Sequence, residues 1–227
     1  MSRKCTLKVF CMVICCLMAF HPNGALAQTD WKLLRHSDNI WVYAKEIEGS
    51  NLKELKTVTY FNTHMDGLVM LLTDVSAQPK FQFGCLSSMR VGPKTKFEQS
   101  FYQELYMPWP FTNRDAVFKQ TIKPNSNANE CIIESHSTID LVPQKSDFVR
   151  VPFMRSKWLL KKTNESQIKA EYIIRVDPGG AVPSWLVNLF MDRGPYESVI
   201  NMRKLLSEPI YQQAQISWLH ETGKGKP

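Results

Sequence analysis

The sequence predicts an α+β fold in which a curved antiparallel β-sheet is wrapped around one long C-terminal helix. Three observations support this prediction. Alternating apolar and polar residues dominate the chain after residue 30, the connections between the alternating runs are short, and a long apolar stripe with helical spacing comes near the end. Successive strands joined by short connections form an antiparallel sheet, and about 200 residues suit one large domain.

Residues 1–27 have the features of a secretory signal peptide. Three basic residues precede an unbroken apolar run from Val9 to Phe20, and Ala25-Leu26-Ala27 offers small residues for cleavage. The run is shorter than the roughly 20 residues that span a bilayer, so a permanent anchor is a less favoured alternative. Lipid attachment at Cys15 or Cys16 is also less favoured, because Ile14 is not small. We expect an exported protein, periplasmic or secreted.

Charge and cysteine content change once this segment is removed. Of the 28 basic and 21 acidic residues, three basic ones lie in residues 1–27, which leaves a formal charge of +4. The charges are scattered, so nucleic acid is not an expected partner, whereas transient contact with an anionic membrane surface is compatible with them. Only Cys85 and Cys131 remain, either as buried free thiols or as one disulfide. No metal-ligand spacing accompanies them.

Alternation predicts the strands, and the short segments between them predict turns. The clearest case is the run from Ile168 to Asp177, in which every second residue is apolar. Gly92-Pro93-Lys94 predicts a hairpin turn. The other predicted strands are Ile40–Ile47, Leu55–Phe61, Phe83–Val91, Phe97–Tyr106, Ala116–Ile122, Cys131–Leu141 and Phe148–Leu160.

Helical spacing appears in two places. A short helix is predicted over His64–Thr73, with Thr63 in a capping box. A long one begins near Pro183, and its apolar stripe runs to Leu206 and on past Pro209 toward Trp218. Gly194-Pro195 interrupts this helix, either as a hinge or as a source of simple curvature. We expect residues 216–227 to form a C-terminal tail.

Two sequence strings carry a family resemblance. Pro108-Trp109-Pro110-Phe111-Thr112-Asn113-Arg114-Asp115 lies between two predicted strands, and its prolines indicate a stiff loop that holds two aromatic side chains outside the strand ladder. Asp177-Pro178-Gly179-Gly180 begins a second string that ends at Asn188, in the long helix. Together with the order of elements, these strings closely resemble the START domain, the steroidogenic-acute-regulatory-related lipid-transfer family, across roughly residues 30–215.

The resemblance implies a helix-grip fold, as in Bet v 1-like proteins, with a hydrophobic cavity inside a domain of residues 28–215. It implies non-catalytic binding and transfer of one lipid, sterol-like or other apolar molecule by a monomer without a cofactor. The loop at 107–113 and the C-terminal helix would form the movable cover.

The resemblance also implies site residues. Sterol-binding relatives share a buried acid and base, and ungapped counting from Arg114 puts Phe101 and Gln120 at those positions, so the charged pair is missing here. A ligand held by packing and one amide hydrogen bond is therefore expected. The expected ligand contacts are Phe101, Trp109, Phe111, Phe118, Gln120, Ser198 and Met202, while Arg114, Asp115 and Asn188 are expected to be structural.

An enzyme on the same fold, such as a cyclase, is the alternative function. The sequence has none of the nucleophile, zinc-protease, P-loop or dinucleotide motifs, and no catalytic residue is proposed. Glu134 and His136 share a strand face, but a solvated face is favoured over a metal site, because no third ligand accompanies them.

Overall fold

One ten-stranded sheet contains most of the regular structure. The computed structural model describes residues 31–49, 52–125, 129–139 and 141–220, so the predicted signal peptide lies outside the described residues. Neighbouring strands are antiparallel, except that the short β8 runs parallel to β6. The strands are β1 (Lys32–Ser37), β2 (Ile40–Glu46), β3 (Lys53–Phe61), β4 (Cys85–Val91), β5 (Glu98–Leu105), β6 (Arg114–Pro124), β7 (Glu130–Ser137), β8 (Val149–Arg150), β9 (Phe153–Asn164) and β10 (Gln167–Asp177).

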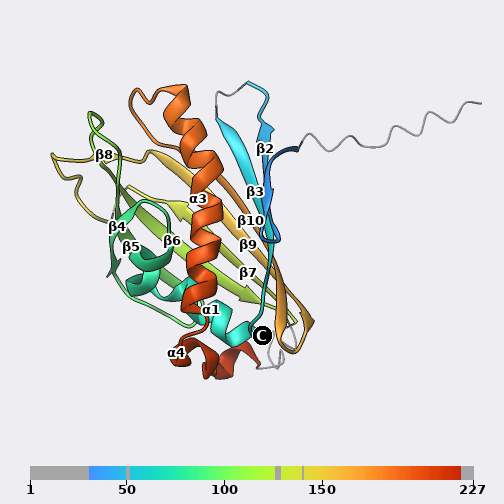
Figure 1. Cartoon of the computed structure of the whole chain (residues 1–227). Coiled ribbons are helices and arrows are strands. Elements are labelled where there is room, and N and C mark those ends of the chain that lie inside the picture. Colours follow the sequence, from blue (N-terminus) through green and yellow to red (C-terminus); the bar gives the residue numbers. More distant parts are fainter. Residues whose placement is uncertain (1–30, 50–51, 126–128, 140, 221–227) are drawn as a thin grey trace, which may run out of the picture. The chain divides into compact units, whose positions relative to one another are not determined.

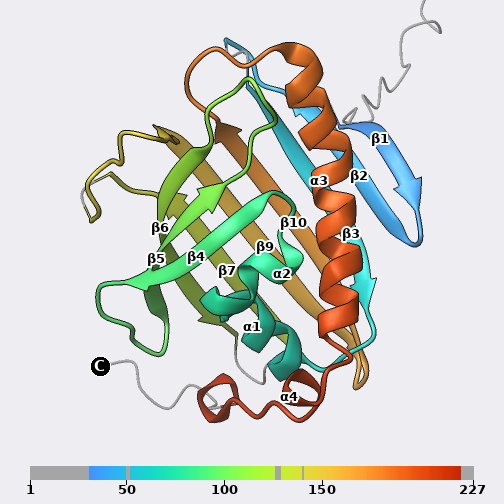
Figure 2. The ribbon, with the colours of Figure 1, turned by 60° about the vertical axis from the view of Figure 1, so that its left-hand side comes forward.

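The strand order brings the last strand back to the middle of the sheet. The order is β1-β2-β3-β10-β9-β7-β6-β5-β4, so the chain leaves β3 for the far edge and returns strand by strand until β10 pairs with β3. The helix α3 (Ser184–Leu205) then crosses one face of this curved sheet (Figures 1 and 2). The predicted α+β helix-grip fold is confirmed.

Alternation decides which face of each strand turns toward α3. In β3 every second residue from Leu55 to Phe61 is buried, and the residues between them are only partly covered. Because successive side chains of a strand point to opposite faces, one face of β3 belongs to the interior. The same rule places Phe101, Phe118 and Met154 on that inner face.

Short helices close one end of the sheet. They are α1 (Met65–Thr73), a 3-10 turn η1 (Val75–Ala77) and α2 (Gln78–Phe81). The α1 helix begins where it was predicted, but its cap is His64 instead of Thr63, since His64 Nδ1 accepts the Gly67 amide at 3.2 Å. Buried leucines of α1 pack with Val199 and Met202 of α3 in the main core cluster.

The end of the chain differs from the predicted helical continuation. The α3 helix stops at Leu205, and the chain turns before α4 (Pro209–Gln212), because proline cannot continue a preceding helix. A 3-10 turn, η3 (Ser217–Leu219), follows, in which Leu219 is only 1% exposed. The predicted tail therefore packs against the core as far as Leu219, and residues 221–227 lie outside the described residues.

Several strand boundaries also differ from prediction. The strand β1 was not predicted. Its residues are exposed or half-buried, and apolar and polar side chains do not alternate along it. The predicted Phe148–Leu160 strand is divided between β8 and β9 at Val151-Pro152, since proline lacks the amide for a ladder bond.

Among the described helices, none is long and apolar enough to cross a membrane.

Candidate functional site

A cavity of about 1380 Å³ lies between α3 and the inner face of the sheet. Its volume exceeds the roughly 300–1,000 Å³ of sites for drug-sized ligands. The lining runs from Leu72 and Phe81 at the α1 end to Leu52, Met107 and Val182 at the opposite end, which we call the loop end. The cavity therefore extends along much of α3.

One stripe of α3 faces this cavity. Val187, Met191, Pro195, Ser198 and Met202 all line it. They lie three or four residues apart, the spacing that puts side chains on one side of a helix. Of the apolar stripe predicted from the sequence, Phe190, Val199 and Met202 line the cavity, whereas Leu186 and Leu189 are outside the described lining.

Five of the expected ligand contacts lie in the cavity lining. These are Phe101, Phe118, Gln120, Ser198 and Met202. Phe101 and Phe118 are directly paired across β5 and β6, with ring centroids 5.2 Å apart. The Ser198 hydroxyl is already engaged, because it donates to Gly194 O at 2.7 Å and accepts from Phe83 N at 3.0 Å.

Gln120 is held by amide and hydroxyl partners. Its Oε1 accepts from Gln99 Nε2 at 2.7 Å, and its Nε2 donates to Leu72 O at 3.4 Å and to Ser135 Oγ at 3.5 Å. Phe101 packs on Phe118. Both positions therefore carry neutral side chains that have partners inside the protein.

Trp109 and Phe111 are the two remaining residues that we expect to contact ligand. Trp109 is 91% exposed, and neither residue is among the described residues that line the cavity. The Phe111 ring lies 6.5 Å from the Trp185 ring at the start of α3. The prolines of the loop hold both aromatic side chains outside the sheet, beside the loop end of the cavity.

Arg114 joins the two sequence strings that carry the family resemblance. Its guanidinium donates to Thr112 O within its own loop, to Pro178 O at 3.2 Å and to Gly179 O at 3.0 Å. Arg114 is only 4% exposed and also lines the cavity. The loop at 107–113 and the segment before α3 are therefore tied by one side chain.

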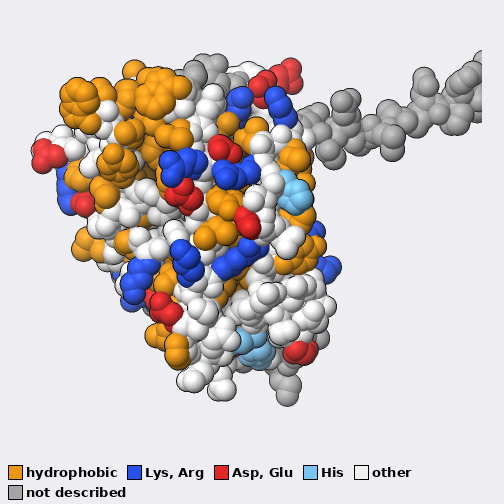
Figure 3. Space-filling model, in the orientation of Figure 1, with side chains coloured by type: hydrophobic (Ala, Val, Ile, Leu, Met, Phe, Trp, Pro, Cys, Tyr) orange, Lys and Arg blue, Asp and Glu red, His pale blue; other side chains and the backbone are white. Residues whose placement is uncertain are grey.

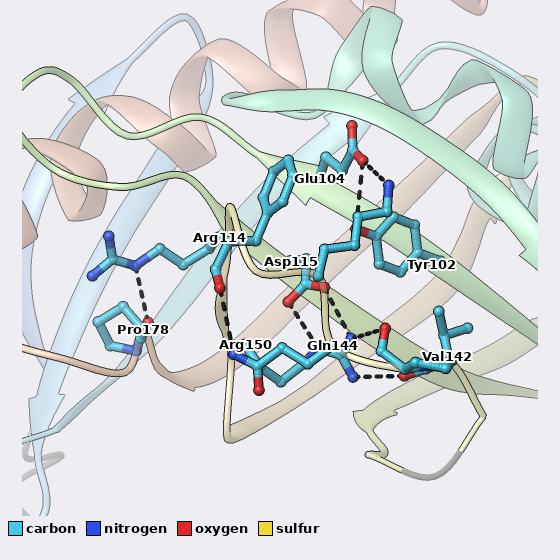
Figure 4. Close-up of polar contacts among 11 residues, drawn as sticks. Tyr102, Glu104, Arg114, Asp115, Val142, Gln144, Arg150 and Pro178 are labelled. Atoms are coloured by element: carbon cyan, nitrogen blue, oxygen red, sulfur yellow. Dashed lines mark hydrogen bonds and ion pairs between the residues drawn. The ribbon is translucent and has the colours of Figure 1, made fainter.

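Asp115 points to the other face of β6. Arg150 donates to both of its carboxylate oxygens, at 2.8 and 2.9 Å, and also to Val142 O at 3.1 Å (Figure 4). The Asp115 side chain is fully buried and that of Arg150 is 9% exposed. This ion pair fastens β8 to β6, and the hydrogen bond to Val142 O holds the segment before β8.

The string beginning at Asp177 needs its two glycines. Gly179 and Gly180 have φ angles of +67° and +66°, which other residues rarely adopt. A Cβ on Gly179 would come within 3.1 Å of Arg150 O. Asn188, expected to be structural, lies in the cavity lining.

Sequence reasoning missed a cluster of buried amides beside α2. Gln103 Nε2 donates to Gln78 Oε1 and, at 3.0 Å, to Gln82 Oε1, and all three residues line the cavity. The sequence could have indicated that Gln103 faces inward, because Gln99, Phe101 and Gln103 are spaced two residues apart on one strand. That spacing does not indicate that the inner face borders a cavity.

The titratable groups near the cavity are neutral or paired. Burial raises the pKa of Tyr172 to about 12, against a smaller opposing effect of its hydrogen bond with Ser156. Cys85 and Cys131 are free, and burial raises the pKa of each thiol to about 12. Glu134 contacts Lys123 and Lys157, and the described residues contain no cluster of three or more potential His, Cys, Asp or Glu metal ligands.

Hydrophobic side chains also gather outside the cavity at its loop end (Figure 3). Trp109, Trp185, Tyr106 and Leu189 are 91%, 60%, 48% and 37% exposed. We call these four residues the apolar patch. Trp109 lies in the loop at 107–113 and Tyr106 lies just before that loop. Trp185 and Leu189 lie in the first turns of α3.

Comparisons with known proteins agree with this architecture. The family model described as START domain matches residues 12–209. An uncharacterized protein of Pseudomonas aeruginosa is 26% identical over 85% of this chain and 94% of its own length. Rat phosphatidylcholine transfer protein is 24% identical over 72% of this chain and 78% of its own length.

Solved structures show the same fold. A STAR-related lipid transfer protein from Xanthomonas axonopodis superposes with a TM-score of 0.72 at 26% identity, covering 79% of this chain and 99% of that one. Human STARD10 gives a TM-score of 0.69 at 22% identity, covering 80% and 76% of the two chains. A Streptomyces aromatase/cyclase shares the fold more distantly, with a TM-score of 0.52 at 7% identity, covering 68% and 93%.

Proposed function

The chain belongs to the START-domain family, and we propose from this premise that it binds one lipid in the α3 cavity and transfers it without chemical reaction. The observation that carries this proposal is the cavity itself, about 1380 Å³ in volume and bounded by apolar side chains of α3 and the sheet. Burying apolar surface contributes roughly 25 cal/mol per Å², which is sufficient for binding. Similarity to proteins named for lipid transfer supports the same function.

Native mass spectrometry of the protein purified from its producing cells tests this proposal. We expect a co-purified lipid that leaves on denaturation, and movement of that lipid between vesicles when protein is added. An empty cavity together with failure to load any lipid from vesicles would contradict it. Turnover of an aromatic or polyketide-like compound would instead favour the cyclase-like alternative.

The loop at 107–113 and the first half of α3 form the cover of the cavity in this proposal. Residues 187–198 of α3 are all exposed or half-buried, whereas Val199, Met202 and Leu205 belong to the main core cluster. Segments with few buried contacts open at lower free energy than the core. The N-terminal half of α3 should therefore move first, bending near Gly194-Pro195.

The apolar patch is the surface that meets the membrane in this proposal. Tryptophan and tyrosine side chains suit the boundary between headgroups and acyl chains. Since the patch lies beside the loop end of the cavity, a lipid leaving there would pass directly into the bilayer.

Export and a monomeric state complete the proposal. The composition of residues 1–27 supports cleavage before Gln28 and a periplasmic or secreted protein. N-terminal sequencing of the protein from cell fractions would test this, and a cytoplasmic protein with an intact N-terminus would contradict it. Sedimentation of the purified protein should give a monomer mass, and a dimer mass would contradict the monomeric state.

A further inference from the structure

One hydroxyl in the cavity wall has no hydrogen-bond partner among the described residues. Thr57 is 2% exposed, its Oγ1 is buried without a partner, and the residue lines the cavity. On β3 it lies between Leu55 and Thr59 on the inner face. A buried hydroxyl without a partner is costly, so an atom of a bound molecule is a natural partner for it.

Thr57 begins a row of neutral polar groups across the inner face. Tyr172 of β10 is its direct neighbour in the sheet, and Ser156 of β9 lies diagonally across from Tyr172, since it is paired with Ile174. Ser156 is paired with Ser135 of β7, and Ser135 with Gln120 of β6. We call these residues the polar belt: Thr57, Tyr172, Ser156, Ser135 and Gln120. All five line the cavity.

Apolar residues lie on both sides of the polar belt. Toward the α1 end, Leu72, Val199 and Met202 line the cavity. Toward the loop end, Phe101, Phe118 and Met154 do so. A molecule that fills the cavity would therefore place a polar function at the belt and apolar parts on either side of it.

Charged lining residues are confined to the loop end. Lys53 contacts Glu46 at 3.3 Å, Arg114 binds backbone carbonyls, and the Asp177 carboxylate accepts from Gly179 N. These four are the charged residues among the described lining. Thr57 lies four residues along β3 from Lys53, about 13 Å at 3.3 Å per residue. An ionised group at the belt would thus be buried without a counter-charge, which is strongly unfavourable.

We propose that the polar belt is a hydrogen-bonding subsite for an uncharged oxygen function of the ligand, a hydroxyl or an ester carbonyl, with Thr57 as a specificity-determining residue. Because the charged lining residues lie at the loop end and not at the belt, a lipid whose polar end is neutral fits there better than one that would bring a phosphate to the belt. This inference rests on the proposed lipid-binding function.

Competitive loading tests the selection. The full protein is incubated with phosphatidylcholine vesicles that contain equal amounts of dioleoylglycerol, cholesterol and dioleoylphosphatidate, and the bound lipid is identified by native mass spectrometry. We expect at least about tenfold preference for dioleoylglycerol or cholesterol over dioleoylphosphatidate.

Substitution of Thr57 tests the residue. Thr57→Val keeps the shape and removes the hydroxyl, and should lower loading of the preferred neutral lipid by about two- to tenfold, as expected for one neutral hydrogen bond. Thr57→Ser should retain loading. Thr63→Val is the matched control, because Thr63 Oγ1 is also buried without a partner but Thr63 is outside the described cavity lining.

The outcomes separate the two proposals. Equal or better loading of dioleoylphosphatidate, loading of phosphatidylcholine alone, or equal behaviour of Thr57→Val and Thr63→Val would overturn the neutral-lipid subsite while lipid binding stands. Loading of no lipid at all would overturn lipid binding itself. If Thr57→Val does not fold, the selectivity of the unmodified protein still decides the question.

Discussion

Arg114 and Asp115 are neighbours in the sequence that act on opposite faces of β6. Arg114 turns toward the cavity and holds backbone carbonyls of two loops, while Asp115 turns outward to Arg150. The alternation of a strand requires this division. Two oppositely charged residues can therefore be adjacent in the sequence and still bind different partners.

The Asp115–Arg150 pair should contribute strongly to stability. Asp115→Ala leaves a nearly buried guanidinium without its carboxylate, and we expect the free energy of unfolding to fall by about 3–5 kcal/mol. Urea denaturation measures this. Glu134→Ala, which removes a partly exposed partner of two lysines, is the control and should cost about 1 kcal/mol or less. Equal effects of the two substitutions would contradict the role of the buried pair.

The two thiols should be unreactive in the folded protein. Burial raises the pKa of both Cys85 and Cys131 to about 12, so little thiolate forms near neutral pH. For the chain beginning at Gln28, we expect Ellman's reagent to titrate both thiols only after denaturation. Fast reaction of the native protein, or no free thiol after denaturation without reductant, would contradict this expectation.

The candidate site was only partly predictable from single residues. Phe101, Phe118 and Met202 were expected from the family resemblance, and all three lie in the cavity lining. Thr57 and Gln103 were missed, since periodicity does not distinguish an inner face that touches other side chains from one that borders a cavity. Trp109 is the converse case: an aromatic side chain in a loop string turned out to be exposed.

At the scale of elements, long alternating segments were predicted best. The strand β10 and the α1 helix lie close to their predicted positions, and β10 supplies Tyr172 and Ile174 to the cavity. Prolines decided most of the differences, dividing β8 from β9 and ending α3 before Pro209. The packing of the last residues depends on contacts with residues distant in the sequence. For example, Ile216 N donates to Asp66 Oδ1 at 2.6 Å. Local sequence patterns cannot reveal such contacts.

The interruption in α3 can be tested by removing its glycine. A Cβ at Gly194 would lie 3.5 Å from the Phe83 ring, an ordinary contact, so Gly194→Ala should stiffen the helix by about 1 kcal/mol without a clash. If opening bends the helix here, vesicle-to-vesicle transfer should slow by about fivefold. Lys204→Ala, in the anchored half of α3, should not change the rate. A more stable Gly194→Ala variant with unchanged transfer would assign the interruption to curvature alone.

For the whole molecule, the order of elements and two short strings were enough to predict the sheet, the crossing helix and the family. Cavity volume could not be predicted, because it depends on how far α3 stands from the sheet. That separation is set by contacts at both ends of the helix. Val199 and Met202 pack at one end, and Arg114 holds the segment leading into the other.

Transfer should depend on Trp109 and Phe111, in the loop at 107–113, more than folding does. Replacing both Trp109 and Phe111 with alanine removes side chains at the loop end, and we expect transfer to fall by about tenfold or more through lost burial in lipid. The melting temperature should fall by only a few degrees, because Trp109 is 91% exposed and Phe111 is only half-buried. Ile210→Ala is the control, since Ile210 is 55% exposed in α4. Equal losses of transfer and stability would reduce the loop to a structural role.

The Arg114 contacts have a kinetic consequence. Because one guanidinium binds carbonyl groups in the loop at 107–113 and in the segment before α3, neither segment can lift away without weakening the hold on the other. The two sides of the cover should thus separate in a single cooperative event with one barrier. Ligand exchange should follow a single exponential in the unmodified protein and divide into two phases once this side chain is shortened.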